Sequence, residues 1–261
     1  MNILCATDFT AASDTALRFA AVLARRLDGR ITLLHMLPKG ERTQATRTAL
    51  DKAMAEQRTR CACADISEPL LIEGDVVHGI AQESVRRHGL LISGTHGPRG
   101  LRQALLGADM LKVARRSAIP CLVVQEQSAV NAPERIVVPV AGHHDIGRLL
   151  DTVVLLARAF GSEVHIFQSA RPHEQVSEEL AANTERMVDR FQAEGLAWVH
   201  SIEPAKVFSV GFAEATIRFA GEMNAGLIAI MAHASDEYRH IADAEKERML
   251  VNAAKIPVLL A

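Results

Sequence analysis

The sequence has neither an excess of charge of one sign nor a long apolar run. Its 29 Lys and Arg residues nearly balance its 31 Asp and Glu residues, which leaves a formal net charge of -2. Such a balance gives no electrostatic footprint for a nucleic acid or an acidic membrane surface. No segment reaches the ~18 consecutive apolar residues that span a bilayer. The first residues, MNILCATDFT, lack the regions of a secretory signal, so we expect a cytoplasmic protein.

Cysteine is scarce, with four residues in the chain. In a reducing compartment free thiols are the default. Cys5 and Cys121 lie within apolar runs, so we expect both in the core. Cys61 and Cys63 lie close together near the end of the second predicted helix, and no second paired cluster accompanies them. They are either a zinc or redox site or ordinary thiols in the turn before the next strand.

Several motifs of nucleotide-handling enzymes are also missing. The sequence has no Walker loop ending in Gly-Lys-Ser or Gly-Lys-Thr. It has no Ser-Gly-Gly-x-Asp-Ser pyrophosphatase loop and no His-Ile-Gly-His adenylation motif. Its histidines and acidic residues form no set of nucleophile, base and orienting residue. We therefore expect no catalytic residues, and at most slow ATP hydrolysis.

What the first half does contain is an alternation of short apolar runs with longer segments of helical period. This pattern is typical of βα units around a mostly parallel sheet. Because the runs are nearly all apolar, helices should cover both faces of the sheet. The runs predict strands at residues 3–7, 30–36, 69–72, 90–93 and 121–124.

The same order repeats after the polar stretch QSAVNAPE (127–134), which reads as a linker. The second set of strands is predicted at 136–140, 163–167, 196–200, 227–231 and 257–260. Ile3 and Ile136 are 133 positions apart, and Pro120 and Pro257 are 137 apart, so equivalent landmarks keep nearly one offset. We predict two tandem α/β domains, 1–127 and 134–261, each an open, Rossmann-like, five-stranded parallel sheet flanked by helices. The alternative is a single α/β domain of ten strands.

Two loops of the first half are the candidates for ligand binding. Ligands of open parallel sheets bind beyond the carboxyl ends of the strands, where the strand order reverses. One loop, ATDFTAAS, places Asp8, Thr10 and Ser13 between the first strand and the next helix. The other follows the fourth strand and contains Gly94 and Gly97. These glycines either let a phosphate approach the backbone N–H groups or form a tight turn.

The two loops resemble those of the universal stress protein family. Its nucleotide-binding members carry Gly-x2-Gly-x9-Gly, followed by Ser or Thr, after the fourth strand. Gly94, Gly97 and Gly107 match this spacing, and Asp8 matches the family's aspartate that contacts the nucleoside. The resemblance covers the chain twice and implies an adenine nucleotide, ATP or AMP, with or without Mg²⁺. It also implies a regulatory or sensing role in the stress response.

Other residues extend the candidate site or depart from the family. Ala108 replaces the family's Ser or Thr, so one phosphate hydrogen bond of ~0.5–1.5 kcal/mol is missing. His96, Arg99 and Arg102 either compensate by contacting phosphate or are solvated loop residues. Gly74, after the third strand, resembles a family glycine that borders the nucleotide, or it forms a simple turn. Met36 closes the second strand beside His35 and is a further candidate contact.

The second half keeps the strand order but not these residues. Ala141 stands where the family has its aspartate, in IVVPVAGHH. The segment AHASDEYRHIADAEKE after the fourth strand has no glycine, and its carboxylates would repel a triphosphate. We therefore predict one nucleotide site per chain, in the first half. The alternative is a nucleotide-independent interaction protein or a sensor of another ligand or a metal.

The two halves are also expected to pack against each other. An exposed apolar strand edge promotes aggregation, and pairing two such edges removes it. We predict a pseudo-dimer within the chain through the edges of the fifth strands, with a homodimer of whole chains as a further option.

Overall fold

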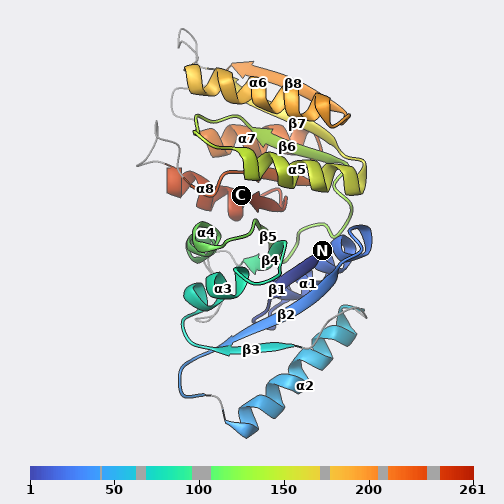
Figure 1. Cartoon of the computed structure of the whole chain (residues 1–261), viewed down its shortest axis with the longest axis vertical. Coiled ribbons are helices and arrows are strands. Elements are labelled where there is room, and N and C mark those ends of the chain that lie inside the picture. The colour runs from blue at the N-terminus through green and yellow to red at the C-terminus, as the bar shows by residue number, and fades with distance from the viewer. Residues whose placement is uncertain (42, 63–68, 96–106, 171–176, 205–210, 234–241) are drawn as a thin grey trace. The chain divides into compact units, whose positions relative to one another are not determined.

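The structure is a computed structural model that describes residues 1–261 except 42, 63–68, 96–106, 171–176, 205–210 and 234–241. It divides into two compact units, Met1–Asn131 and Ala132–Ala261. The division falls inside the polar stretch 127–134. Each unit has its own alternation of strands and helices, in blue to green and in yellow-green to red (Figure 1).

The first unit contains a parallel sheet with the strand order β3-β2-β1-β4-β5. All pairs within it are parallel. The strand order reverses between β1 and β4, which creates a switch point at their carboxyl ends. This confirms the predicted fold class. The strands are β1 (Asn2–Ala6), β2 (Arg30–Leu37), β3 (Leu70–Glu73), β4 (Leu90–Thr95) and β5 (Cys121–Gln125), and the helices between them are α1 (Ala11–Arg26), α2 (Gln44–Arg60), α3 (Val76–Ser84) and α4 (Gly107–Arg116).

Helices cover both faces of this sheet, as the apolar runs predict. Thr7, after β1, contacts Ser13 of α1 and Gln57 of α2 on one face. Met36 of β2 lies against Gly79 of α3. His35 precedes Met36 in the same strand and therefore points to the opposite face, because successive strand residues alternate. The two neighbours in the sequence thus belong to different surroundings.

Helix α1 begins close to the switch point and packs tightly against the sheet. Thr10 caps it, and Asp14 places a negative charge in its first turn, where the helix dipole favours an anion. Ala12, Ala16 and Ala20 lie four residues apart and are fully buried, so a row of methyl groups runs along the buried face of the helix. Small side chains at this spacing allow a close approach to the strands.

The second unit repeats the arrangement. Its parallel sheet has the order β10-β9-β6-β7-β8, which is the order of the first unit read from the other edge with each number raised by five. The repeated order agrees with a duplication. The strands are β6 (Arg135–Pro139), β7 (Glu163–Ala170), β8 (Trp198–Pro204), β9 (Leu227–Ile230) and β10 (Val258–Leu260), and the helices are α5 (Gly147–Phe160), α6 (Glu178–Ala193), α7 (Phe212–Glu222) and α8 (Ala242–Leu250).

The strand ends differ from the predicted ones by at most four residues. β1 ends at Ala6, so Asp8 lies two residues beyond the strand instead of directly after it. β7 and β8 continue to Ala170 and Pro204, past the predicted ends at 167 and 200, because their ladder continues after the apolar run has ended. Main-chain pairing does not require apolar side chains, and the apolar pattern therefore misses such extensions. In the described part of the chain, every helix falls short of the length and apolar character needed to cross a bilayer.

Candidate functional site

The carboxylate of Asp8 is held in a defined position at the switch point of the first unit. Asp8 is half-buried, and its Oδ1 accepts hydrogen bonds from the Thr10 N–H at 3.1 Å and from the Thr10 hydroxyl at 2.6 Å. An aspartate that bonds the backbone two residues ahead forms an Asx turn. Thr10 in turn accepts a hydrogen bond from the Ser13 N–H and so caps α1. The turn therefore presents Asp8 at the entrance to the helix.

Phe9 holds the loop in a conformation that bulky residues rarely adopt. Its φ is 63°, in the left-handed region. Its N–H donates to Thr7 Oγ1 at 3.0 Å, and its ring packs on His35 of β2 with 4.7 Å between ring centroids. His35 Nδ1 also lies 2.8 Å from the Thr7 carbonyl oxygen. Surrounding contacts are needed to maintain such a backbone, and here Thr7 and His35 supply them.

Gly94 brings the end of β4 against the first turn of α1. A Cβ at this position would lie 2.5 Å from the Ala12 carbonyl carbon, 2.6 Å from the Ala12 oxygen and 2.7 Å from the Ser13 nitrogen. All three are backbone atoms, so a side chain cannot be accommodated by turning a neighbouring rotamer. Packing between strand and helix therefore requires this glycine, and its contact with a phosphate stays a prediction.

The rest of the glycine loop is only partly described. His96, Gly97, Arg99 and Arg102 lie outside the described residues. Gly107 is the first residue of α4 and Ala108 the second. The first N–H groups of a helix have no acceptor within it and are available to an anion. The predicted loop thus starts at β4 and ends at a helix N-terminus, as a phosphate-binding loop would require.

Two further candidates, Met36 and Gly74, end the neighbouring strands. Gly74 follows β3 with a φ of 144°, which side chains rarely allow, and its N–H donates to the Leu37 carbonyl oxygen at 2.8 Å. A Cβ at Gly74 would have no heavy atom within 4 Å. Met36 is half-buried against Gly79. The parallel order β3-β2-β1-β4 brings the carboxyl ends of these strands to one edge, where Met36 and Gly94 lie within β2 and β4 and Gly74 and Asp8 follow β3 and β1.

A buried polar cluster, which sequence reasoning missed, lies behind the Asp8 turn. The Thr7 hydroxyl donates to Gln57 Oε1 at 2.9 Å, and Gln57 Nε2 donates to Asp14 Oδ1 at 2.8 Å. Arg60 holds the same carboxylate with two bonds, Nε to Oδ2 at 2.6 Å and Nη2 to Oδ1 at 2.9 Å. Gln57 is 0% exposed. The cluster therefore joins the end of β1 to the first turn of α1 and the last turns of α2.

The charge of Asp14 is favoured in this cluster. Burial by itself raises the pKa of its carboxyl group. The hydrogen bonds from Arg60 and Gln57 and the positive charges of Arg60 and Arg18 outweigh burial. The pKa of Asp14 consequently lies below its ordinary value of 3.8, and the carboxylate is ionised at neutral pH.

The surroundings of Cys61 do not suit the zinc or redox interpretation. The thiol is 7% exposed, and its Sγ donates to the Asp14 carbonyl oxygen at 3.6 Å. Burial, and then the charge of Asp14, raise the pKa of Cys61, whereas a zinc ligand must be a thiolate. Cys63 lies outside the described residues. Within the described ranges, no group of three or more His, Cys, Asp or Glu residues could hold a metal ion.

We predict low thiol reactivity in the native protein. In a Cys63→Ser variant the remaining cysteines are Cys5, Cys61 and Cys121, all buried, and burial also raises the pKa of Cys121. Titration with Ellman's reagent at pH 8 should label less than one equivalent within minutes, and three equivalents after unfolding in guanidinium chloride. One rapidly labelled thiol in the native variant would contradict the buried position of Cys61.

The second unit has different side chains at the equivalent switch point. Ile3 pairs with Leu90 in the first unit and Ile136 with Leu227 in the second, so Met231 occupies the position of Gly94. The offset of 133 likewise places Ala141 at the position of Asp8. It also places Val140 and Ile146 at the positions of Thr7 and Ser13. The polar groups of the first unit are therefore replaced by apolar ones.

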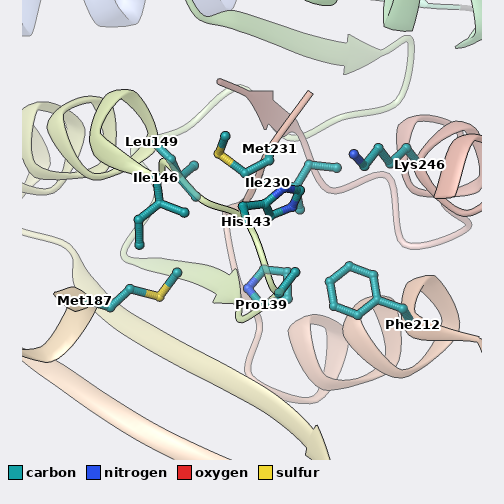
Figure 2. A pocket seen from close by; sticks show the side chains of 10 residues that line it. Pro139, His143, Ile146, Leu149, Met187, Phe212, Ile230, Met231 and Lys246 are labelled. Carbon is teal, nitrogen blue, oxygen red and sulfur yellow. The ribbon is translucent and has the colours of Figure 1, made fainter. Parts of the chain in front are cut away.

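A small pocket remains at this second switch point. Figure 2 shows Ile146 and Leu149 on one side of the pocket and Phe212 and Lys246 on the other, with Met231 between them. Its cavity volume is about 20 Å³, enough for about one water molecule. The pocket, as the described residues form it, is much smaller than a nucleotide.

Side chains from α8 close this region. Lys246, 6% exposed, donates from its ammonium group to the carbonyl oxygens of Ala232 and His233, which follow β9. Glu245 accepts a hydrogen bond from the Ala213 N–H at 2.7 Å and thereby caps the start of α7. Two side chains of α8 thus bond backbone groups next to the second switch point.

Comparisons with known proteins agree with this two-unit architecture. Residues 1–125 match the model of the Universal stress protein family. A universal stress protein from Archaeoglobus fulgidus DSM 4304 superposes with a TM-score of 0.74 at 17% identity, covering 100% of this chain and 95% of that one. A functionally unknown protein from Pseudomonas aeruginosa PAO1 superposes with a TM-score of 0.60 at 18% identity, covering 99% and 91%. No match is found among the curated proteins.

Proposed function

We propose that the first unit, whose residues 1–125 match the Universal stress protein family, binds an adenine nucleotide, ATP or AMP. The observation that carries the proposal is the position of Asp8, held by Thr10 at the switch point between β1 and β4. The spacing of Gly94, Gly97 and Gly107 supports it. The proposed role is that of a regulatory or sensing module in the stress response.

In the proposed site, one loop contacts the nucleoside and a second loop contacts the phosphates. The Asp8 carboxylate accepts hydrogen bonds from the hydroxyl groups of the nucleoside, next to Met36 and Gly74. The phosphates lie at the loop from Gly97 to Gly107, where the first N–H groups of α4 favour an anion. Ala108 contributes its backbone N–H and no hydroxyl, so affinity for the phosphates is lower than with Ser or Thr.

We propose one such site per chain. In the second unit, Ala141 provides no carboxylate and Met231 takes the place of Gly94. The remaining cavity of about 20 Å³ supports the same conclusion. The first unit alone should therefore account for all nucleotide binding.

Isothermal titration with AMP and with ATP, each with and without MgCl2, tests this proposal. We expect one site per chain in the wild type and binding weakened about 10- to 100-fold in Asp8→Ala, because hydrogen bonds to a charged group are lost. Gly97→Glu should abolish binding by placing a negative side chain at the phosphates. Asp51→Ala is the matched control, since Asp51 is an exposed acid on α2.

Mass spectrometry of the denatured, purified protein gives an independent measurement of bound nucleotide. Two equivalents per chain would contradict the single site. No bound nucleotide together with no titratable binding would contradict the proposal and favour a nucleotide-independent interaction protein.

A further inference from the structure

Helix α2 is attached to the first unit by few buried groups. Of its 17 residues, Met54 and Gln57 are the buried ones. The corresponding helix of the second unit, α6, buries Asn183 and two large apolar side chains, Met187 and Phe191. Segments with few buried apolar contacts undock at low free-energy cost. The docking of α2 therefore depends strongly on its polar contacts.

Those polar contacts lead directly to the Asp8 turn. Gln57 bonds Thr7, one residue before Asp8, and also Asp14 in the first turn of α1. Arg60 at the end of α2 adds the two-bond contact with Asp14. The polar contacts of Gln57 and Arg60 thus attach α2 to residues 7–14. The same segment contains Asp8, the proposed ligand of the nucleotide.

Gln57 Oε1, at 2.9 Å, is the nearer of two acceptors for the Thr7 hydroxyl, and Ser13 Oγ, at 3.2 Å, is the other. Gln57 Nε2 donates to Asp14, which leaves Gln57 Oε1 as the acceptor for Thr7. A threonine hydroxyl has one proton. When that proton goes to Gln57, the lone pairs of Thr7 Oγ1 are available to the Phe9 N–H, which lies 3.0 Å away. Docked α2 therefore helps to hold Thr7, the residue that bonds the Phe9 N–H, and undocking leaves Ser13 Oγ, 3.2 Å away, as the acceptor for the Thr7 hydroxyl.

We propose that docking of α2 and nucleotide binding at the Asp8 turn are energetically coupled through Gln57. The coupling rests on the proposed nucleotide site. A nucleotide that binds Asp8 and Thr10 in their present arrangement stabilises the state in which Thr7 bonds Gln57. By linkage, docking of α2 raises nucleotide affinity by the same factor. Helix α2 is then the part of the protein that reports whether the site is occupied.

Hydrogen exchange measured by mass spectrometry tests the coupling in the full chain. We expect saturating AMP to slow exchange of the amides in residues 50–60 about 5- to 10-fold. Gln57→Leu keeps a side chain of similar size but forms neither bond. It should lower AMP affinity by a similar factor and remove the slowing in α2.

A second variant and a control make the test specific. Arg60→Met removes the ion pair with Asp14. The Arg60 side chain is 47% exposed, so we expect the fold to be retained and AMP affinity to fall by less than in Gln57→Leu. Lys52→Met changes a side chain of α2 that is 78% exposed and should behave as the wild type.

The outcomes separate the coupling from the nucleotide site itself. AMP binding in the wild type with unchanged exchange in α2 overturns the coupling and leaves the proposed site standing. Wild-type affinity in both Gln57→Leu and Arg60→Met also overturns it. No AMP binding in the wild type overturns the site and the coupling together.

Discussion

Gly94→Ala should destabilise the first unit by about 3 kcal/mol, the upper part of the usual range for overpacking a core. The added methyl group would lie 2.5–2.7 Å from backbone atoms of Ala12 and Ser13. Relief requires moving α1 away from β4, which opens gaps along the alanine face of the helix. Because the same helix start carries Thr10 and Asp14, the change should also displace the Asp8 turn.

Urea unfolding measures this effect, and the chain contains a matched control. Far-UV circular dichroism follows both units, whereas fluorescence of Trp198, the one tryptophan, reports on the second. Gly221→Ala makes the same substitution at the end of α7, where a Cβ would meet nothing within 4 Å. It should be neutral or stabilising by up to about 1 kcal/mol, as expected for glycine in a helix. Equal midpoints for Gly94→Ala and the wild type would contradict the close packing of β4 and α1.

Asp14→Ala should lower the free energy of unfolding by about 3 kcal/mol at pH 7. The substitution leaves the fully buried Gln57 amide without its acceptor and removes hydrogen bonds to a charged group. It also releases the end of α2 from α1. The exposed acid Asp51 provides the control, and Asp51→Ala should change stability by less than about 0.5 kcal/mol.

The contribution of Asp14 should depend on pH in a defined direction. Its pKa is lower in the folded protein than its ordinary value of 3.8. A lowered pKa contributes stability that is fully present above the unfolded-state value and is lost as the pH falls through the folded-state value. The difference between the wild type and Asp14→Ala should therefore be constant from pH 7 to about pH 5 and shrink below about pH 4. A difference that grows on acidification would contradict the lowered pKa.

Local pattern was sufficient to predict the fold. Each strand of an open parallel sheet is covered on both faces and is therefore a nearly continuous apolar run. Such a run can be recognised in the sequence before its neighbouring strands are known. The similar offsets between Ile3 and Ile136, 133 positions, and between Pro120 and Pro257, 137 positions, indicated the duplication for the same reason. Strand ends were less well predicted, because the β7–β8 ladder extends through polar residues as far as Pro204.

The candidate site was predicted in part. The position of Asp8 followed from its place after the first strand, and the structure shows how Thr10 holds it. Gly94 was expected from its spacing, but the atoms it approaches, in Ala12 and Ser13, precede it by about 80 positions in the sequence. The sequence contained no local signal for that approach.

Sequence alone therefore determined the α/β class, the two repeats and the replacement of Asp8 by Ala141 in the second repeat. Each of these features can be recognised within a short segment of the chain. Only the tertiary structure revealed the Gln57–Asp14–Arg60 cluster, since its partners lie 43 and 46 positions apart and α2 has no apolar stripe to indicate a buried glutamine. It also showed that Met231 and α8 leave a cavity of about 20 Å³ in the second unit. Such features depend on which side chains meet across the fold, and that is decided by packing in three dimensions.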